Sequence, residues 1–127
     1  MEKKRVLIVD DDKIVLNVIK DALTKEGYHV FTSEQSLGTS RIVAEIKPHL
    51  LIMDVMMPGL SGDKICRILK DSYINEKMKI ILYSCKNRDE LEKIAVEAKV
   101  EDFLSKSGNH RELLNKVNSL LKNQMIA

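Results

Sequence analysis

Reactive side chains follow four strand-like apolar segments of this chain. The segments span residues 6–9, 50–53, 80–83 and 100–104, and the side chains beyond them are Asp10, Asp11, Asp54, Ser84 and Lys106. If these segments are parallel strands lying side by side, their carboxyl ends meet at one rim of a sheet. Such a rim would suit a divalent metal ion and a phosphoryl group.

The three carboxylates of Asp10, Asp11 and Asp54 would repel one another at such a rim. Two like charges ~4 Å apart repel by ~4 kcal/mol at an effective dielectric constant of ~20. A hard cation removes this repulsion, and all-oxygen ligands suit Mg²⁺ or Mn²⁺. A carboxylate can also attack a phosphoryl group, which needs positioning and charge neutralisation more than proton transfer. Lys106 and Ser84 are residue types that supply a counter-charge and a hydroxyl donor.

The composition is that of a water-soluble globular protein. The chain has 127 residues, which predicts one domain over 1–127, and 31% of them are charged. A net charge of +2 and few aromatic residues do not favour direct binding to nucleic acid. The basic start precedes only four apolar residues, too few for a signal peptide or a membrane span. Cys66 and Cys85 have no metal-ligand spacing, which predicts a reduced, cytoplasmic setting.

Apolar strand-like segments alternate with helical patterns along the whole chain. Strands are expected at 6–9, 28–32, 50–53, 80–83 and 100–104, and helices at 14 to near 27, 35–46, after 62 to about 71, 87–98 and 113–121. This alternation predicts an α/β fold with a five-stranded parallel sheet and helices on both faces. The alternation alone does not fix the order of the strands. We expect the flavodoxin-like order 2-1-3-4-5, which reverses between the first and third strands and so places the site at the rim that carries Asp10, Asp11 and Asp54.

Three helices have residues that favour a capped start. Asp12 is the expected N-cap of the first helix. Asn87 with Glu90, and Asn109 with Glu112, have the spacing of a capping box.

The whole chain resembles the receiver domain of bacterial two-component response regulators. The motifs that carry the resemblance are Val9-Asp10-Asp11, Asp54-Val55-Met56-Met57-Pro58-Gly59 with Gly62, Ser84, and Phe103-Leu104-Ser105-Lys106. Together these motifs are specific, whereas any one alone is weak.

The resemblance implies that Asp54 accepts a phosphoryl group from the phosphohistidine of a partner histidine kinase or phosphotransfer protein. It implies that Asp11 and Asp54 bind Mg²⁺ directly, that Asp10 binds it largely through water, and that the Met56 backbone carbonyl completes the protein ligands. The domain would catalyse its own phosphorylation and dephosphorylation without being a turnover enzyme.

The resemblance also implies a conformational switch. Lys106 and the Ser84 hydroxyl would bind the phosphoryl oxygens, and the Phe103 ring would turn inward when Ser84 moves. The face made by the fourth helix, fifth strand and fifth helix would then change its binding to a downstream protein target. No output domain is expected within the 127 residues.

Three positions depart from the family pattern. Ser107 follows Lys106 where the family usually has proline after a cis peptide bond, and a cis bond without proline costs ~2.5–4 kcal/mol. Cys85 follows Ser84 where a small residue is usual. Lys99 stands where a glycine usually ends the fourth helix.

Two alternatives remain open from the residues alone. Asp10-x-Asp12 after a strand resembles the haloacid-dehalogenase-like phosphatases, which also use aspartyl chemistry. Against this, the chain is short, Ile14 stands where Thr or Val is usual, and Asp54 would have no role. The second alternative is a pseudo-receiver, a binding module with this fold that never uses phosphate. The Ser107 departure keeps this alternative open.

Overall fold

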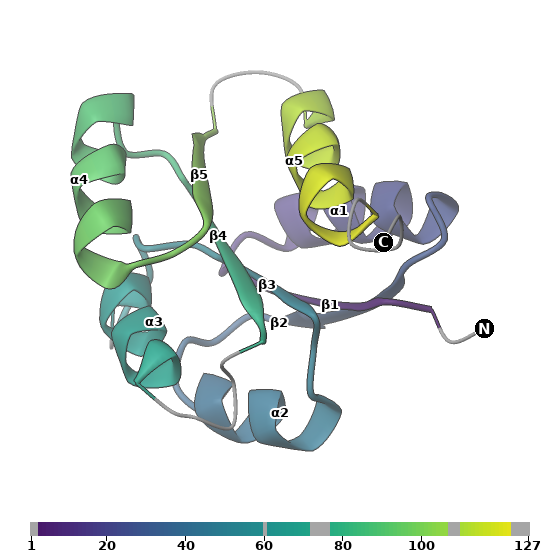
Figure 1. Cartoon of the computed structure of the whole chain (residues 1–127), viewed down its shortest axis with the longest axis horizontal. Coiled ribbons are helices and arrows are strands. Elements are labelled where there is room, and N and C mark those ends of the chain that lie inside the picture. The colour runs from purple at the N-terminus through teal and green to yellow at the C-terminus, as the bar shows by residue number, and fades with distance from the viewer. Residues whose placement is uncertain (1–2, 60, 72–76, 107–109, 123–127) are drawn as a thin grey trace.

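Five parallel strands form one sheet in the order β2-β1-β3-β4-β5, which confirms the predicted topology (Figure 1). The strands are β1 (Arg5–Val9), β2 (His29–Ser33), β3 (Leu50–Met53), β4 (Lys79–Ser84) and β5 (Asp102–Ser105). The helices are α1 (Lys13–Lys25), α2 (Thr39–Ile46), α3 (Gly62–Lys70), α4 (Arg88–Ala98) and α5 (Arg111–Leu121). This computed structural model describes residues 3–59, 61–71, 77–106 and 110–122.

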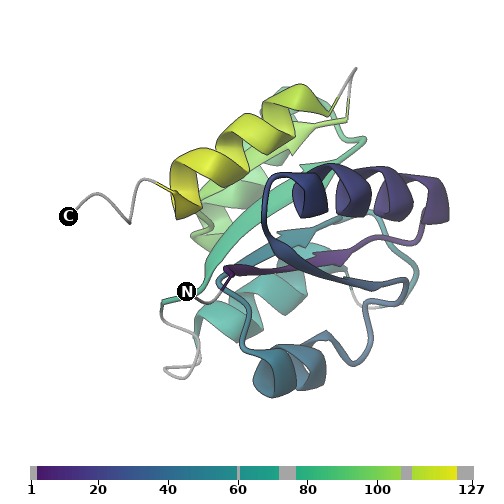
Figure 2. The same cartoon turned by 90° about the vertical axis from the view of Figure 1, so that its right-hand side faces the viewer.

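Helices cover both faces of the sheet, as the alternating pattern predicts. Buried side chains of α1 and α5 pack on one face, and those of α2, α3 and α4 pack on the other. Figure 2 shows α1 and α5 on the opposite side of the sheet from α2 and α3. We call these the α1–α5 face and the α2–α4 face.

The central strands are apolar at every position because both of their faces are covered. In β1, Leu7 and Val9 join the core of the α2–α4 face, whereas Val6 and Ile8 join the core of the α1–α5 face. Successive side chains of a strand point to opposite faces, so a central strand needs apolar residues throughout. Fully burying one such side chain contributes about 1.5–3 kcal/mol.

Two of the three predicted helix caps are confirmed. The Asp12 carboxylate accepts a hydrogen bond from the Ile14 amide at 2.9 Å. The Asn87 side-chain oxygen accepts from the Glu90 amide at 2.9 Å, and its amide nitrogen donates to the Glu90 carboxylate, also at 2.9 Å. The expected Asn109 cap lies outside the described residues.

Helix α2 is shorter than the sequence predicts, beginning at Thr39 instead of residue 35. Gly38 has a φ of +88°, which is left-handed and interrupts any helix before it. The Ser36 carbonyl accepts hydrogen bonds from the Thr39 amide and hydroxyl, at 3.3 Å and 2.7 Å. Residues 36–39 therefore form a turn that leads into the helix.

Strand β5 begins at Asp102, two residues later than predicted, because the C-terminal cap of α4 occupies Lys99 and Val100. Lys99 takes the left-handed conformation itself, with a φ of +58°. A non-glycine residue there costs about 1–2 kcal/mol. The Val100 amide still donates to the Ala95 carbonyl at 3.1 Å, so Val100 belongs to the helix end.

None of the helices in the described part of the chain is long and apolar enough to cross a bilayer.

The two cysteines occupy opposite environments. Cys66 lies in α3 with none of its surface exposed, whereas Cys85 is exposed in the loop after β4. Burial, helped by the nearby Asp63 charge, raises the pKa of the Cys66 thiol to about 12. The reactive thiolate is therefore suppressed at Cys66.

We expect a thiol reagent such as DTNB to label the native protein once, at Cys85. Peptide mapping by mass spectrometry identifies the site, and a second label should appear only after unfolding. In the control, native Cys85→Ser should stay unlabelled. Rapid labelling of that variant would contradict the burial of Cys66.

Candidate functional site

Backbone hydrogen bonds that continue the sheet beyond its strand ends hold three of the predicted site residues. They run from the Asp10 amide to the Ser33 carbonyl (3.1 Å), from the Asp54 amide to the Val9 carbonyl (3.1 Å), and from the Lys106 amide to the Ser84 carbonyl (2.8 Å). The three side chains therefore leave the sheet at one rim. This rim includes the point where the strand order reverses, which is the usual site in open α/β folds.

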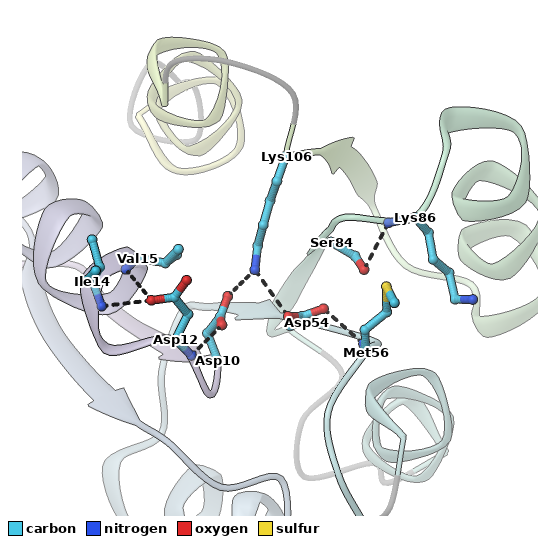
Figure 3. A network of polar contacts seen from close by, with 9 residues as sticks. All are labelled: Asp10, Asp12, Ile14, Val15, Asp54, Met56, Ser84, Lys86 and Lys106. Atoms are coloured by element: carbon cyan, nitrogen blue, oxygen red, sulfur yellow. Dashed lines mark hydrogen bonds and ion pairs between the residues drawn. The ribbon is translucent and has the colours of Figure 1, made fainter.

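The Lys106 ammonium bridges two carboxylates at the centre of this rim (Figure 3). Its Nζ lies 2.5 Å from Asp10 Oδ2 and 3.1 Å from Asp54 Oδ2. The side chain of Lys106 is 12% exposed, and those of Asp10 and Asp54 are 3% and 6% exposed. These are charge-assisted hydrogen bonds shielded from water, which makes them stronger than surface ion pairs.

The second oxygen of each carboxylate is held by the loop that follows its strand. Asp10 Oδ1 accepts from the Asp12 amide, and Asp54 Oδ1 accepts from the Met56 amide, both at 2.9 Å (Figure 3). Each carboxylate is thus oriented by its own loop on one side and by Lys106 on the other.

An exposed third carboxylate, Asp11, completes the predicted acidic group. Asp10, Asp11 and Asp54 each offer an oxygen, and these oxygens all lie within 4.8 Å of one another. Three formal negative charges face the single positive charge of Lys106, so the excess of two matches a divalent cation. Oxygen-only ligands are those that Mg²⁺ prefers, and the residues present fit that ion.

Burial and charge act in opposite directions on the titration of these groups. Burial raises the pKa of the Asp10 carboxyl, although the Lys106 ammonium and the Asp12 amide oppose this. Burial alone would lower the pKa of Lys106, but the Asp10 hydrogen bond and the charges of Asp54 and Asp10 outweigh it and raise the pKa. Lys106 is therefore a permanent cation at neutral pH.

The start of α3 packs directly against the backbone of Asp54. A Cβ atom on Gly62 would lie 2.2 Å from the Asp54 carbonyl oxygen, a distance that no side chain tolerates. Gly62 therefore lets the helix close on the residue that ends β3. This explains in physical terms why the chain has glycine there.

Sequence reasoning missed two serines that brace the loops of the site. The buried Ser36 hydroxyl donates to the Pro58 carbonyl at 3.2 Å, which ties the loop after β2 to the loop after β3. The Ser105 hydroxyl donates to the Lys86 carbonyl at 2.9 Å and ties β5 to the loop after β4. Ser105 belongs to the motif that ends in Lys106, but the contacts of the two serines do not follow from residue type, because small hydroxyl residues are common in loops and at strand ends.

The predicted switch residues lie on one face of neighbouring strands. Ser84 is fully buried, and its hydroxyl accepts a long hydrogen bond of 3.4 Å from the Lys86 amide (Figure 3). The half-buried Phe103 ring packs against the core of the α2–α4 face. Its strand partner is Leu82, two residues before Ser84, so Ser84 and Phe103 are diagonal neighbours. The Arg88 guanidinium carbon lies 5.7 Å from the centre of the Phe103 ring.

Two predicted residues remain, Met56 and Ser107, and the structure describes only Met56. Met56 lies in the loop beside Asp54, with its side chain half-exposed. Ser107, and with it the Lys106–Ser107 peptide bond, lies outside the described residues.

Comparison with known proteins identifies a protein family whose sequence model matches this chain. The family model described as the response regulator receiver domain matches residues 6–118. That match spans every site residue discussed above.

Solved structures with the same fold cover nearly the whole chain. The chemotaxis protein CheY4 of Vibrio cholerae is 20% identical, with 94% of this chain and 100% of that chain covered and a TM-score of 0.86. TrrA of Thermotoga maritima, solved in complex with Mg²⁺ and BeF, is 30% identical, with 93% and 99% covered and a TM-score of 0.82. The BeF3-activated receiver domain of DrrB, also from Thermotoga maritima, is 29% identical, with 95% and 99% covered and a TM-score of 0.82.

Removing the central cation should leave Asp10 and Asp54 as an uncompensated pair of buried charges. We expect Lys106→Met to lower the free energy of unfolding by about 3 kcal/mol at neutral pH, as when one partner of a buried ion pair is deleted. Added Mg²⁺ should stabilise this variant more than it stabilises wild type, because a bound cation replaces the lost charge. Urea denaturation with and without Mg²⁺ measures both effects.

Lys116→Met is the matched control, because Lys116 pairs with Asp102 at 3.0 Å away from the rim. That pair is about one third exposed, so its loss should cost about 1 kcal/mol or less and should not change the response to Mg²⁺. Equal losses and equal Mg²⁺ responses in the two variants would contradict the proposed charge balance.

Proposed function

The chain belongs to the response regulator receiver domain family, and from that membership we propose that it is a phosphorylation-dependent signalling switch with Asp54 as the phosphoryl acceptor. The observation that carries the proposal is the placement of the Asp54 carboxylate. It is held between the Met56 amide and the Lys106 ammonium, at the rim where the carboxylates gather. An oriented carboxylate beside a fixed cation suits phosphoryl transfer, which depends on positioning and charge neutralisation.

In the proposed reaction, an Asp54 carboxylate oxygen attacks the phosphorus of a phosphohistidine on a histidine kinase or phosphotransfer protein. An oxygen–phosphorus bond forms, the nitrogen–phosphorus bond breaks, and the electron pair returns to the histidine ring. The product is an aspartyl-phosphate.

Mg²⁺ is the proposed cofactor, held directly by Asp11 and Asp54, largely through water by Asp10, and by the Met56 carbonyl. When bound, it neutralises the charge that gathers on the phosphoryl oxygens. The Mg²⁺ and BeF complex of the TrrA protein and the oxygen-only ligands at this rim support the assignment.

Lys106 would exchange one of its two carboxylate partners for a phosphoryl oxygen once Asp54 is modified. The Ser84 hydroxyl would donate to a second phosphoryl oxygen. Its present bond to the Lys86 amide is long, at 3.4 Å, and is therefore weak enough to give up.

The movement of Ser84 would open space for the Phe103 ring to turn inward from its position near Arg88. Because Phe103 lies on β5 beside α4, the turn would reshape the face made by α4, β5 and α5. Receiver domains interact with kinases or phosphotransfer proteins and with downstream targets. We propose that a downstream protein, in the cytoplasm, reads this face.

Family membership favours this reading over the haloacid-dehalogenase-like phosphatase. The pseudo-receiver reading stays as an outcome of the test. It would be favoured if Mg²⁺ does not bind and a partner binds Asp54→Ala as well as wild type.

We expect acetyl phosphate or phosphoramidate with Mg²⁺ to add one phosphoryl group to wild type and none to Asp54→Asn. Intact mass spectrometry measures the addition. EDTA should abolish the labelling of wild type, because the carboxylates then lack the cation that neutralises the phosphoryl group.

Equal labelling of wild type and Asp54→Asn would contradict the assignment of Asp54. Repeated turnover of phosphate esters, lost in Asp10→Asn and kept in Asp54→Asn, would instead favour the phosphatase alternative.

A further inference from the structure

An aromatic ring lies beneath the central lysine of the site and has no role in the proposed function so far. Tyr83, the residue before Ser84 on β4, is buried, with 7% of its surface exposed. The Nζ atom of Lys106 lies 5.5 Å from the centre of the Tyr83 ring. An ammonium within about 6 Å of a ring centre is attracted by the negative face of the ring.

The sheet itself brings these two residues together. Tyr83 pairs in register with Leu104 on β5, and both belong to the core of the α1–α5 face. Lys106 is two residues beyond Leu104, so alternation along the strand returns its side chain to the same face. The hydrogen bond from the Lys106 amide to the Ser84 carbonyl fixes the backbone there. The Lys106 side chain therefore lies on the same side of the sheet as the ring, with its Nζ atom above the ring face.

We propose that Tyr83 is a positioning residue for phosphoryl transfer, holding the Lys106 ammonium over Asp54 through the face of its ring. The proposal rests on the function proposed above. Lysine is a point charge on a flexible four-carbon stem, so its direction must be set by what surrounds it.

The ring differs from the other partners of Lys106 in one respect. Asp10 and Asp54 hold the ammonium directly, but Asp54 changes its chemistry when it accepts the phosphoryl group and Asp10 faces the metal ion. Tyr83 takes part in neither event. It would therefore keep Nζ over the site while the ammonium exchanges a carboxylate for a phosphoryl oxygen.

In this proposal the face of the Tyr83 ring, and not its hydroxyl, positions the Lys106 ammonium. Suitable variants can therefore distinguish this role from simple packing in the core. Tyr83→Phe keeps the face and Tyr83→Leu removes it while the site stays apolar. With phosphoramidate and Mg²⁺, we expect Tyr83→Leu to be labelled about tenfold more slowly than wild type. Tyr83→Phe keeps the ring and should be labelled at the wild-type rate. Tyr83→Leu should have a lower maximal labelling rate, whereas the phosphoramidate concentration that gives half of the maximal rate should stay as in wild type.

A direct readout of the contact is the carbon–proton NMR signal of the Lys106 ε-methylene. A methylene over an aromatic face has ring-shifted proton resonances, which should be present in wild type and Tyr83→Phe and absent in Tyr83→Leu. A residue that only fills the core would show no such link between the lysine signal and the labelling rate.

Tyr28→Leu is the matched control for the loss of a buried tyrosine. Tyr28 lies in the same α1–α5 core with Lys122 Nζ 5.7 Å from its ring centre, but outside the site. It should lose stability in thermal melting and keep the wild-type labelling rate. If Tyr83→Leu does not fold, Tyr83→Met offers the same apolar, ringless test.

Equal labelling rates in folded Tyr83→Leu, or Tyr83→Met, and wild type would overturn the proposal. So would a Lys106 signal that does not depend on the ring. If wild type itself takes no phosphoryl group at Asp54 while the ring-shifted signal is present, the proposed function fails instead, and the two failures are thus distinguished.

Discussion

The structure of the site depends on one charge balance: buried carboxylates from two neighbouring strands share a single ammonium. Asp10 and Asp54 are almost fully buried, and Lys106 contacts both. Without that cation, two adjacent buried negative charges would oppose folding, because low-dielectric surroundings strengthen their repulsion. With it, the rim still carries more negative than positive charge once Asp11 is counted. The same imbalance that makes the lysine necessary makes the rim receptive to a divalent cation.

The fold maintains this balance with backbone contacts more than with side chains. One extra ladder hydrogen bond holds the amide of each of Asp10, Asp54 and Lys106, so their positions follow from the sheet. The missing side chain of Gly62 lets α3 close on Asp54. The hydrogen bond from the Ser36 hydroxyl to the Pro58 carbonyl holds the loop after β3 in place. Under the proposed function, a frame held in this way would let phosphorylation of Asp54 move only the weakly held groups, such as the Ser84 hydroxyl with its 3.4 Å hydrogen bond.

The meeting of Asp10, Asp54 and Lys106 was predictable because each residue follows an apolar run, and parallel strands bring such ends together. The strand order was expected from the flavodoxin-like fold and not from the residues alone, because apolar runs do not specify which strands are neighbours. The caps at Asp12 and Asn87 were predictable because they depend on local spacing alone. The positions of Ser36, Ser105 and Tyr83 relative to the site were not, since they depend on which loops and strands lie side by side. The late starts of α2 and β5 were missed because backbone conformation at Gly38 and Lys99 decided them, against the apolar pattern.

The most direct test of the charge balance is a crystal structure of the wild-type protein with Mg²⁺ and beryllofluoride, a phosphoryl mimic. If the balance governs the site, the mimic will be bonded to the Asp54 carboxylate. Mg²⁺ will be bound by Asp11, Asp54 and the Met56 carbonyl, and the Lys106 ammonium will contact a fluoride. A structure in which Lys106 still bridges Asp10 and Asp54, with neither metal nor mimic at the rim, would contradict it.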